Sequence, residues 1–222
     1  MNINVKDKVL RQDIADELDF EPSVDSADIG IAVENGVVTL TGHVPSFTQK
    51  LAAERAVWRV KGVKALAQEI QVRLAGDKKN NDDEIAQRAV SLLAWNSSVP
   101  PNAVRVTVQN GLVTLQGKVD WNYQRVAAEA DVRKLSGIVG LINNITLVPD
   151  TTAQPSEVKR SIADALKRHA EVEADRIRVS VRDSGVVSLE GEVHNWDERD
   201  AAERAAWCVP GVRAVEDHLR IG

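Results

Sequence analysis

Apolar positions in the first third of the chain change from a helical to a strand-like period. Residues 5–20 place apolar side chains three and four apart, which predicts an amphipathic helix. Residues 29–34 then alternate apolar and polar side chains, as a half-buried strand does. Asn35-Gly36 predicts a type I′ hairpin turn, because both central residues of that turn need a positive φ. We therefore expect a helix and a two-stranded hairpin whose return strand spans about residues 37–44.

A second helix and a third strand complete this pattern. Residues 47–60 return to helical spacing behind Ser46, a favourable N-cap residue, and the inner helix face is rich in alanine. Alanine would let the helix lie close to a sheet, and we expect Gly42 to serve the same close approach. Residues 66–72 predict the third strand. The order is helix, strand, strand, helix, strand, and a right-handed crossover makes the last two strands parallel.

The predicted fold class is therefore α+β, with two helices on one face of a three-stranded mixed sheet. The opposite face would carry Ala32, Thr39 and Thr41, which are small or polar enough to meet water.

The whole pattern of helices and strands is repeated three times along the chain. The strand motif of residues 36–42 returns at residues 111–117 and 185–191, so its first glycines lie 75 and then 74 residues apart. Such a period corresponds to one small domain rather than to one turn of a solenoid. We expect three tandem αββαβ domains at residues 1–76, 77–150 and 151–222, here called the first, second and third units.

Two details are particular to the third unit. Ser156 precedes its first helical pattern, and we expect this serine to cap the helix. Its hairpin turn, Arg182-Asp183-Ser184-Gly185, has one residue more than the turn of the first unit, which predicts a bulge or a longer loop.

Charge and composition exclude several classes of protein. The formal net charge is −5, with nine basic and eleven acidic residues in the first unit, eight of each in the second, and eleven and fourteen in the third. No unit has the net positive charge on which nucleic-acid binding depends. No apolar run is long enough to span a membrane, and the N-terminus has no apolar signal core, so we expect a cytoplasmic protein.

The sequence also lacks the motifs of catalysis. It has no glycine-rich phosphate loop, no metal-binding histidine motif and no nucleophile elbow. His194 and His218 could approach each other, but a metal site would need further ligands. Cys208 is the single cysteine, which excludes a disulfide within the chain, and we expect a buried or half-buried thiol. We therefore expect neither an enzyme nor a cofactor.

Two stretches carry a resemblance to a known family. They are the octapeptide Asn35-Gly36-Val37-Val38-Thr39-Leu40-Thr41-Gly42 and the region from Trp196 through Val209-Pro210-Gly211-Val212. Both resemble the BON domain, a bacterial module of osmotically inducible and nodulation-type proteins, and the resemblance covers essentially the whole chain as three units. It implies an αββαβ domain without enzymatic activity that binds phospholipid or other membrane-associated ligands, often in stress-related and exported proteins.

The tryptophans allow two interpretations. Trp58 and Trp207 take the same position late in a second helix, Trp121 and Trp196 lie at the entry to a second helix, and Trp95 ends a first helix. Most of them would cap small cores, since large aromatic side chains are highly buried on average. The alternative is an interfacial role, for which Trp95, Trp121, Trp196 and Trp207 are the candidates.

Basic residues gather beside Trp58 at the end of the second helix of the first unit. They are Arg55, Arg59, Lys61 and Lys64, and with Trp58 they form the candidate site for a lipid headgroup. Each basic residue near an anionic surface contributes about 1 kcal/mol, so four together would bind weakly and at low salt.

Two functions follow as hypotheses. The first is a non-catalytic module that binds phospholipid or a membrane-associated protein, with avidity across three copies. The alternative is a structural or chaperone-like stress protein that acts through protein–protein contacts, using open sheet faces or edge strands.

Overall fold

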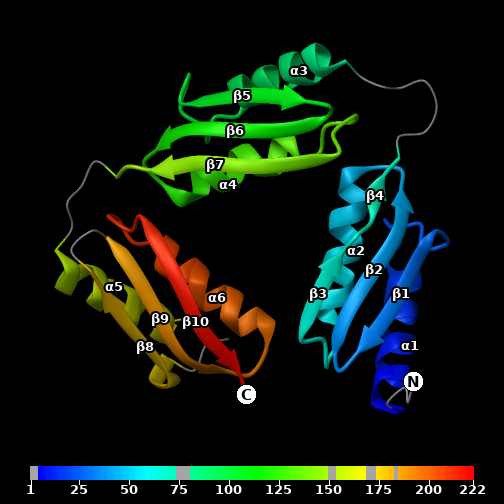
Figure 1. Ribbon diagram of the computed structural model, residues 1–222. Coiled ribbons are helices and arrows are strands. Elements are labelled where there is room, and N and C mark those ends of the chain that lie inside the picture. The colour runs from blue at the N-terminus through cyan, green and yellow to red at the C-terminus, as the bar shows by residue number, and fades with distance from the viewer. Residues whose placement is uncertain (1–4, 74–80, 150–153, 169–173, 183–184) are drawn as a thin grey trace. The chain divides into compact units, whose positions relative to one another are not determined.

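Each of the three units has the helix-strand-strand-helix-strand order that the sequence predicts. The computed structural model describes residues 5–73, 81–149, 154–168, 174–182 and 185–222 (Figure 1). The first unit contains α1 (Val5–Phe20), β1 (Ile29–Glu34), β2 (Val37–Val44), α2 (Phe47–Arg59), β3 (Ala65–Gln68) and β4 (Gln71–Val72). The second contains α3 (Asp82–Trp95), β5 (Val104–Gln109), β6 (Leu112–Val119), α4 (Asn122–Val132) and β7 (Gly140–Leu147). The third contains α5 (Pro155–Arg168), the 3-10 turn η1 (Ala174–Arg176), β8 (Ile177–Val181), β9 (Val186–Val193), α6 (Trp196–Trp207) and β10 (Ala214–Ile221).

The return strand of the hairpin is the central strand of every sheet. In the first unit β2 pairs antiparallel with β1 and parallel with β3, so Val38 lies between Val33 and Leu66. In the third unit β9 pairs antiparallel with β8 and parallel with β10. The sheet of the second unit has the order β5-β6-β7. The predicted α+β fold with a mixed sheet is therefore confirmed.

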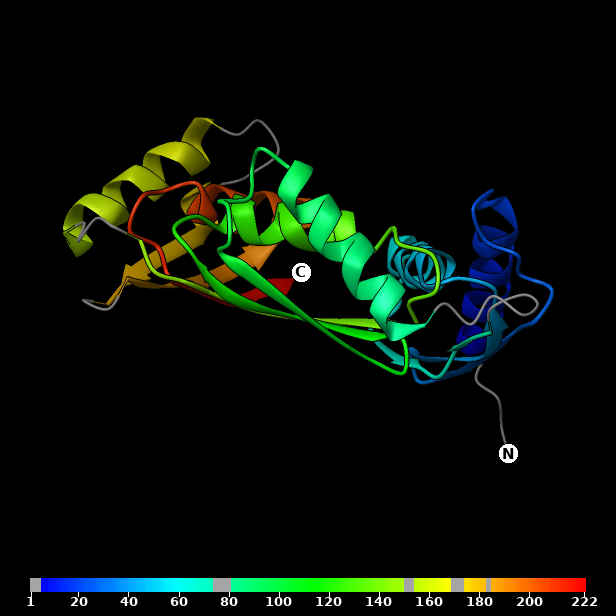
Figure 2. The same ribbon diagram turned by 90° about the horizontal axis from the view of Figure 1, so that it is seen from above.

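Both helices of a unit cover the same face of its sheet, as the edge-on view in Figure 2 shows. The core of the first unit lies between them and is made of the following buried residues: Leu10, Ile14 and Leu18 of α1, Ala53, Ala56 and Val57 of α2, and Val38, Leu40 and Val44 of β2. On the opposite face Ala32 and Thr41 are exposed and Thr39 is half-buried, so this face meets solvent through small side chains.

A buried carboxylate at the start of the first helix holds the hairpin turn. Asn35 and Gly36 adopt the positive φ values of the predicted turn, 53° and 81°. Their backbone N–H groups donate to the carboxylate of Asp7, at N–O distances of 3.1 and 3.2 Å. Asp82 accepts from the corresponding turn of the second unit at 2.7 and 2.9 Å. These hydrogen bonds fix the helix start against the hairpin in the first and second units.

Gly42 serves a different contact from the one predicted. Its φ is 107°, and a Cβ atom there would lie 1.9 Å from the backbone oxygen of Asp28. The glycine therefore leaves room for the chain that enters β1, whose Asp28 and Ile29 backbone atoms are the nearest to this position. The counterparts Gly117 and Gly191 face Ala103 and Arg176 in the same way.

Two predicted element boundaries are wrong. The third strand of the first unit is divided after Gln68 into β3 and β4, which both pair in parallel with β2, and at the break the side-chain oxygen of Gln68 accepts a hydrogen bond from Ile70 N at 3.0 Å. In the third unit the helix begins at Pro155, one residue before the predicted cap Ser156, because the Gln154 carbonyl already accepts from Glu157 and Val158. The longer turn predicted for this unit includes residues 183 and 184, which lie outside the described residues.

A polar side chain of the last strand joins it to the second helix in the second and third units. Gln68, Asn143 and Asp217 occupy equivalent positions, and each accepts a hydrogen bond from the N–H two residues later. Asn143 also donates to Glu129 of α4 at 2.9 Å, and Asp217 accepts from Arg199 of α6. In the first unit, by contrast, Nε2 of Gln68 is buried without a hydrogen-bond partner among the described residues.

Candidate membrane-contact site

Two of the tryptophans belong to the hydrophobic cores. Trp58 packs against the core of the first unit and Trp207 against the core of the third. The indole N–H of Trp207 donates to Glu203 one turn earlier, at 3.0 Å. For these two residues the core interpretation fits, because both are half-buried.

Trp121 and Trp196 lie at helix starts, as their positions in the sequence suggest. They are 36% and 37% exposed. The Trp121 ring lies 6.4 Å from that of Tyr123, and the Arg199 guanidinium lies 5.0 Å from the centre of the Trp196 ring. Their exposed edges are available for contact, but each ring is already engaged by a neighbour.

Trp95 differs from the other four because it is 89% exposed. It ends α3, whose inner face is formed by Ile85, Ala89 and Leu93. Leu92 lies three residues before Trp95, so the two neighbour each other on the helix surface, and Leu92 is itself 37% exposed. Arg88 precedes Leu92 by one turn and extends this stripe with a positive charge.

Equivalent positions in the other units carry a different chemistry. Phe20 corresponds to Trp95 and is also exposed, but Glu17 takes the place of Leu92. In the third unit these positions are Arg168 and Ala165. Trp95 could be named from the sequence, but the stripe was missed, although residues 88, 92 and 95 follow helical spacing along the flank of the buried face of α3.

The two helices of the first unit are joined by an ionic contact. Arg59 of α2 donates to Glu17 of α1 at 2.7 Å and to Glu21 at 2.9 Å. These carboxylates, Glu17 first, raise the pKa of Arg59. The pKa of Glu21 is lowered, chiefly by a hydrogen bond from the Ser23 hydroxyl and then by Arg59. Arg59 is therefore neutralised within its own unit.

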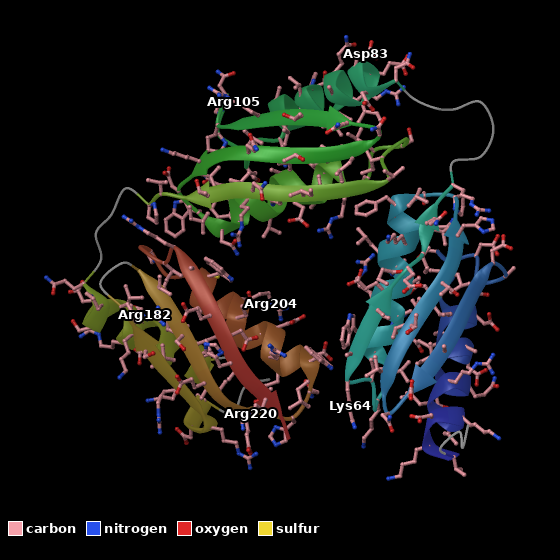
Figure 3. The ribbon with its side chains drawn as sticks, viewed as in Figure 1. Lys64, Asp83, Arg105, Arg182, Arg204 and Arg220 are labelled. Atoms are coloured by element: carbon pink, nitrogen blue, oxygen red, sulfur yellow. The ribbon has the colours of Figure 1, made fainter. Side chains whose placement is uncertain are left out.

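The predicted headgroup residues thus separate into two groups. Arg59 faces α1, Trp58 lies against the core, and the Arg55 side chain bonds to the Leu51 carbonyl one turn earlier. Lys61 and Lys64 instead line a groove of about 620 Å³ at the other end of α1. Figure 3 shows Lys64 at this end of the first unit.

The groove lies where the start of α1, the hairpin turn and the loop after α2 meet. Its apolar side is formed by Val5, Val9 and Leu10, of which Val5 is 76% and Val9 56% exposed. Lys6, Asp7 and Asp13 also line it. It therefore combines exposed apolar surface with charges of both signs.

The histidines and the cysteine considered for catalysis can be placed in the part of the chain that the structure describes. No three His, Cys, Asp or Glu side chains lie close enough there to hold a metal ion. His194 lies 3.0 Å from Glu198, whose carboxylate also accepts from His194 N. Cys208 is exposed at the C-cap of α6, contrary to the buried or half-buried thiol that we expected, because it lies where the helix ends. No described helix has the length and the apolar character that crossing a bilayer requires.

Two curated bacterial proteins are similar in sequence to this chain. Osmotically-inducible protein Y of Escherichia coli K12 is 29% identical over 127 residues, which cover 55% of this chain and 63% of that protein. A 21 kDa hemolysin of Actinobacillus pleuropneumoniae is 28% identical over 146 residues, which cover 64% of this chain and 75% of that protein.

Among solved structures, a structural protein of the type III secretion system of Chlamydia trachomatis, CdsD, aligns over 95% of this chain and 91% of its own at 19% identity, with a TM-score of only 0.26. The family model of the BON domain matches residues 6–73, 81–149 and 156–222, one match for each sheet with its two helices. The chain therefore belongs to the BON domain family and contains three copies of the domain.

Proposed function

We propose that this chain is a non-catalytic binding protein that associates with phospholipid surfaces. The observation that carries the proposal is Trp95, which is 89% exposed beside Leu92 at the end of α3. An indole ring suits the boundary between water and acyl chains, because it has a large apolar body and one N–H donor. Similarity to an osmotically inducible protein supports a role in a stress response.

The helices of the second unit expose further large apolar side chains besides Trp95. Its exposed large apolar residues are Val90, Leu92 and Trp95 of α3, and Tyr123 and Val126 of α4. The described helices of the third unit expose one such residue, Trp196. An apolar helix face that remains open to water marks a surface for association.

Co-sedimentation with phospholipid vesicles tests the proposal. The substitution Trp95→Ala should weaken vesicle binding by about tenfold or more, because each 1.4 kcal/mol lost is a factor of ten and an anchoring tryptophan contributes ~2 kcal/mol. Phe20→Ala is the matched control. It removes an equally exposed aromatic residue from the end of α1, where Glu17 and Glu21 make the neighbouring surface acidic. Equal binding by wild type and Trp95→Ala would contradict the proposal.

A protein partner is the alternative that the open sheet faces favour. Ala32 and Thr41 leave the outer face of the first sheet exposed, and β1 and β3 leave edges unpaired within that sheet. This alternative expects self-association or binding of unfolded chains without any dependence on lipid. Analytical ultracentrifugation with and without vesicles distinguishes the protein-partner function from phospholipid binding. The cytoplasmic location expected from the sequence stays a prediction, which cell fractionation tests.

A further inference from the structure

The groove of the first unit holds opposite charges along one apolar wall. Lys61 and Lys64 provide ammonium groups from the loop after α2, and Asp13 provides a carboxylate from α1. Val5, Val9 and Leu10 form the apolar wall. A ligand that satisfies all three features must carry an anion, a cation and a hydrophobic part.

The carboxylate of Asp13 is available to such a ligand, whereas that of Asp7 is not. Asp7 already accepts two backbone hydrogen bonds from the hairpin turn and is buried. Asp13 is exposed, and within the described part of the chain it has neither a hydrogen bond nor an ion pair. The same holds for the side chains of Lys61 and Lys64, so the opposite charges share the groove without neutralising each other.

The backbone positions Lys64 firmly at the mouth of the groove. Its N–H donates to the Gly36 carbonyl at 2.9 Å, which ties the start of the last strand to the hairpin turn. A Cβ atom on Gly36 would lie 3.1 Å from Cδ of Lys64, so the lysine stem runs along the glycine. The labelled Lys64 side chain in Figure 3 extends from this end of the unit.

We propose that this groove binds the phosphoethanolamine headgroup of a phospholipid. Lys61 and Lys64 donate to the phosphate, Asp13 accepts from the primary ammonium, and Val5 and Val9 contact the glycerol and the first acyl carbons. The inference rests on the proposed function, because it assigns the class of lipid to a membrane-associating protein.

Charge complementarity favours this headgroup over two others. A headgroup that is only anionic would place negative charge beside Asp13 and would meet a protein whose net charge is −5. A choline headgroup has the same charges, but its quaternary ammonium has no N–H to donate to the carboxylate. The primary ammonium offers three donors and so distinguishes ethanolamine from choline.

The site belongs to the first unit alone. The second unit has Arg88, Ser136 and Val139 in place of Asp13, Lys61 and Lys64, and Arg88 donates to the Ser136 hydroxyl at 3.4 Å. The third unit has Pro210 in place of Lys61. One headgroup is therefore expected for each chain.

Titration of the full chain with soluble headgroups, followed by two-dimensional NMR, tests the assignment. The probes are glycerophosphoethanolamine, glycerophosphocholine and inorganic phosphate. We expect glycerophosphoethanolamine to bind most tightly and to shift the amide signals of Asp13, Lys61 and Lys64. Phosphatidylcholine vesicles should bind the protein more tightly when they contain phosphatidylethanolamine.

Two variants separate the roles of the charges. Asp13→Asn should bring the affinity ratio of ethanolamine to choline down to unity, whereas Lys64→Gln should weaken both. The controls Asp164→Asn and Lys8→Gln make the same changes on exposed helix positions outside the groove and should alter neither.

The other outcomes of the titration and of vesicle binding each contradict part of the assignment. Equal affinity for ethanolamine and choline, or a preference that survives in Asp13→Asn, would overturn the inference while vesicle binding through Trp95 stands. Groove shifts without any vesicle binding would contradict the proposed function and the assignment of the groove to a lipid. Shifts caused by inorganic phosphate alone would show a simple anion site.

Discussion

Two glycines with nearly the same φ allow the cost of backbone strain to be distinguished from the cost of a steric clash. The φ values of Gly42 and Gly62 are 107° and 104°, where a side chain is strained in either case. A Cβ on Gly62 would meet only Leu10, at 3.8 Å, but a Cβ on Gly42 would lie 1.9 Å from the Asp28 oxygen. We expect Gly62→Ala to cost roughly 1–2 kcal/mol of stability and Gly42→Ala clearly more. Denaturant unfolding of the two variants checks this order, and equal losses would contradict the contact.

The pH dependence of stability tests the carboxylate of Glu21. Its pKa in the folded protein is lowered from the ordinary 4.5, first by Ser23 and then by Arg59. A lowered pKa adds stability that is present above the ordinary value and is lost as the pH falls through the folded value. We therefore expect Glu21→Gln to lower the Tm at neutral pH, and the difference from wild type to vanish in acid. Ser23→Ala should reproduce part of the neutral-pH loss. A difference that stays constant with pH would contradict the assignment.

At the scale of elements, one side chain ties the last strand to the second helix. Asp217 of β10 accepts from Leu219 N at 2.9 Å and from the Arg199 guanidinium of α6. Asp217→Ala removes both bonds and should cost about 1–3 kcal/mol, whereas Asp217→Asn keeps an acceptor for Leu219 and should cost less. Urea unfolding of the two variants measures the difference. Equal losses of stability in the two variants would show that the hydrogen bond from Leu219 N to Asp217 contributes nothing.

The period of the apolar residues was enough to predict the elements. It located α1, both hairpin strands and α2, because each of these buries one side and exposes the other. It failed at Ser156, because the helix starts where the Gln154 carbonyl accepts its first hydrogen bonds, and it gave no sign of the break after Gln68. Neither feature leaves a trace in hydrophobic spacing. Backbone detail within a few residues, rather than the apolar period, marks these boundaries.

The candidate sites were predictable only in part, for the same reason. The aromatic residue at the end of α3 could be named from the sequence, but its exposure depends on how α3 packs. Arg59 resembles Lys61 and Lys64 in the sequence, yet it lies against Glu17 and Glu21, which are 42 and 38 residues away. Whether a basic side chain is free to bind a ligand depends on acidic partners far away in the sequence, which no local pattern shows.

For the whole molecule, the net charge and the exposure of Trp95 predict an unusual salt dependence of binding to anionic vesicles. A chain with a net charge of −5 is repelled by an anionic surface, and salt weakens this repulsion, since the Debye length falls from about 30 Å at 0.01 M to ~8 Å at 0.15 M. Contact through an indole ring is not electrostatic, so salt does not weaken it.

Binding to anionic vesicles should therefore hold steady or increase as sodium chloride is raised. A cluster of four free basic residues would give the opposite result, because screening would remove its attraction to the surface. The structure leaves Arg59 paired and moves Lys61 and Lys64 to a separate groove, so that cluster does not exist as one surface. Co-sedimentation across a salt series measures the trend, with Trp95→Ala in parallel to show that the salt-resistant part depends on the ring. Binding that disappears with salt in both proteins would assign the contact to basic side chains and exclude α3.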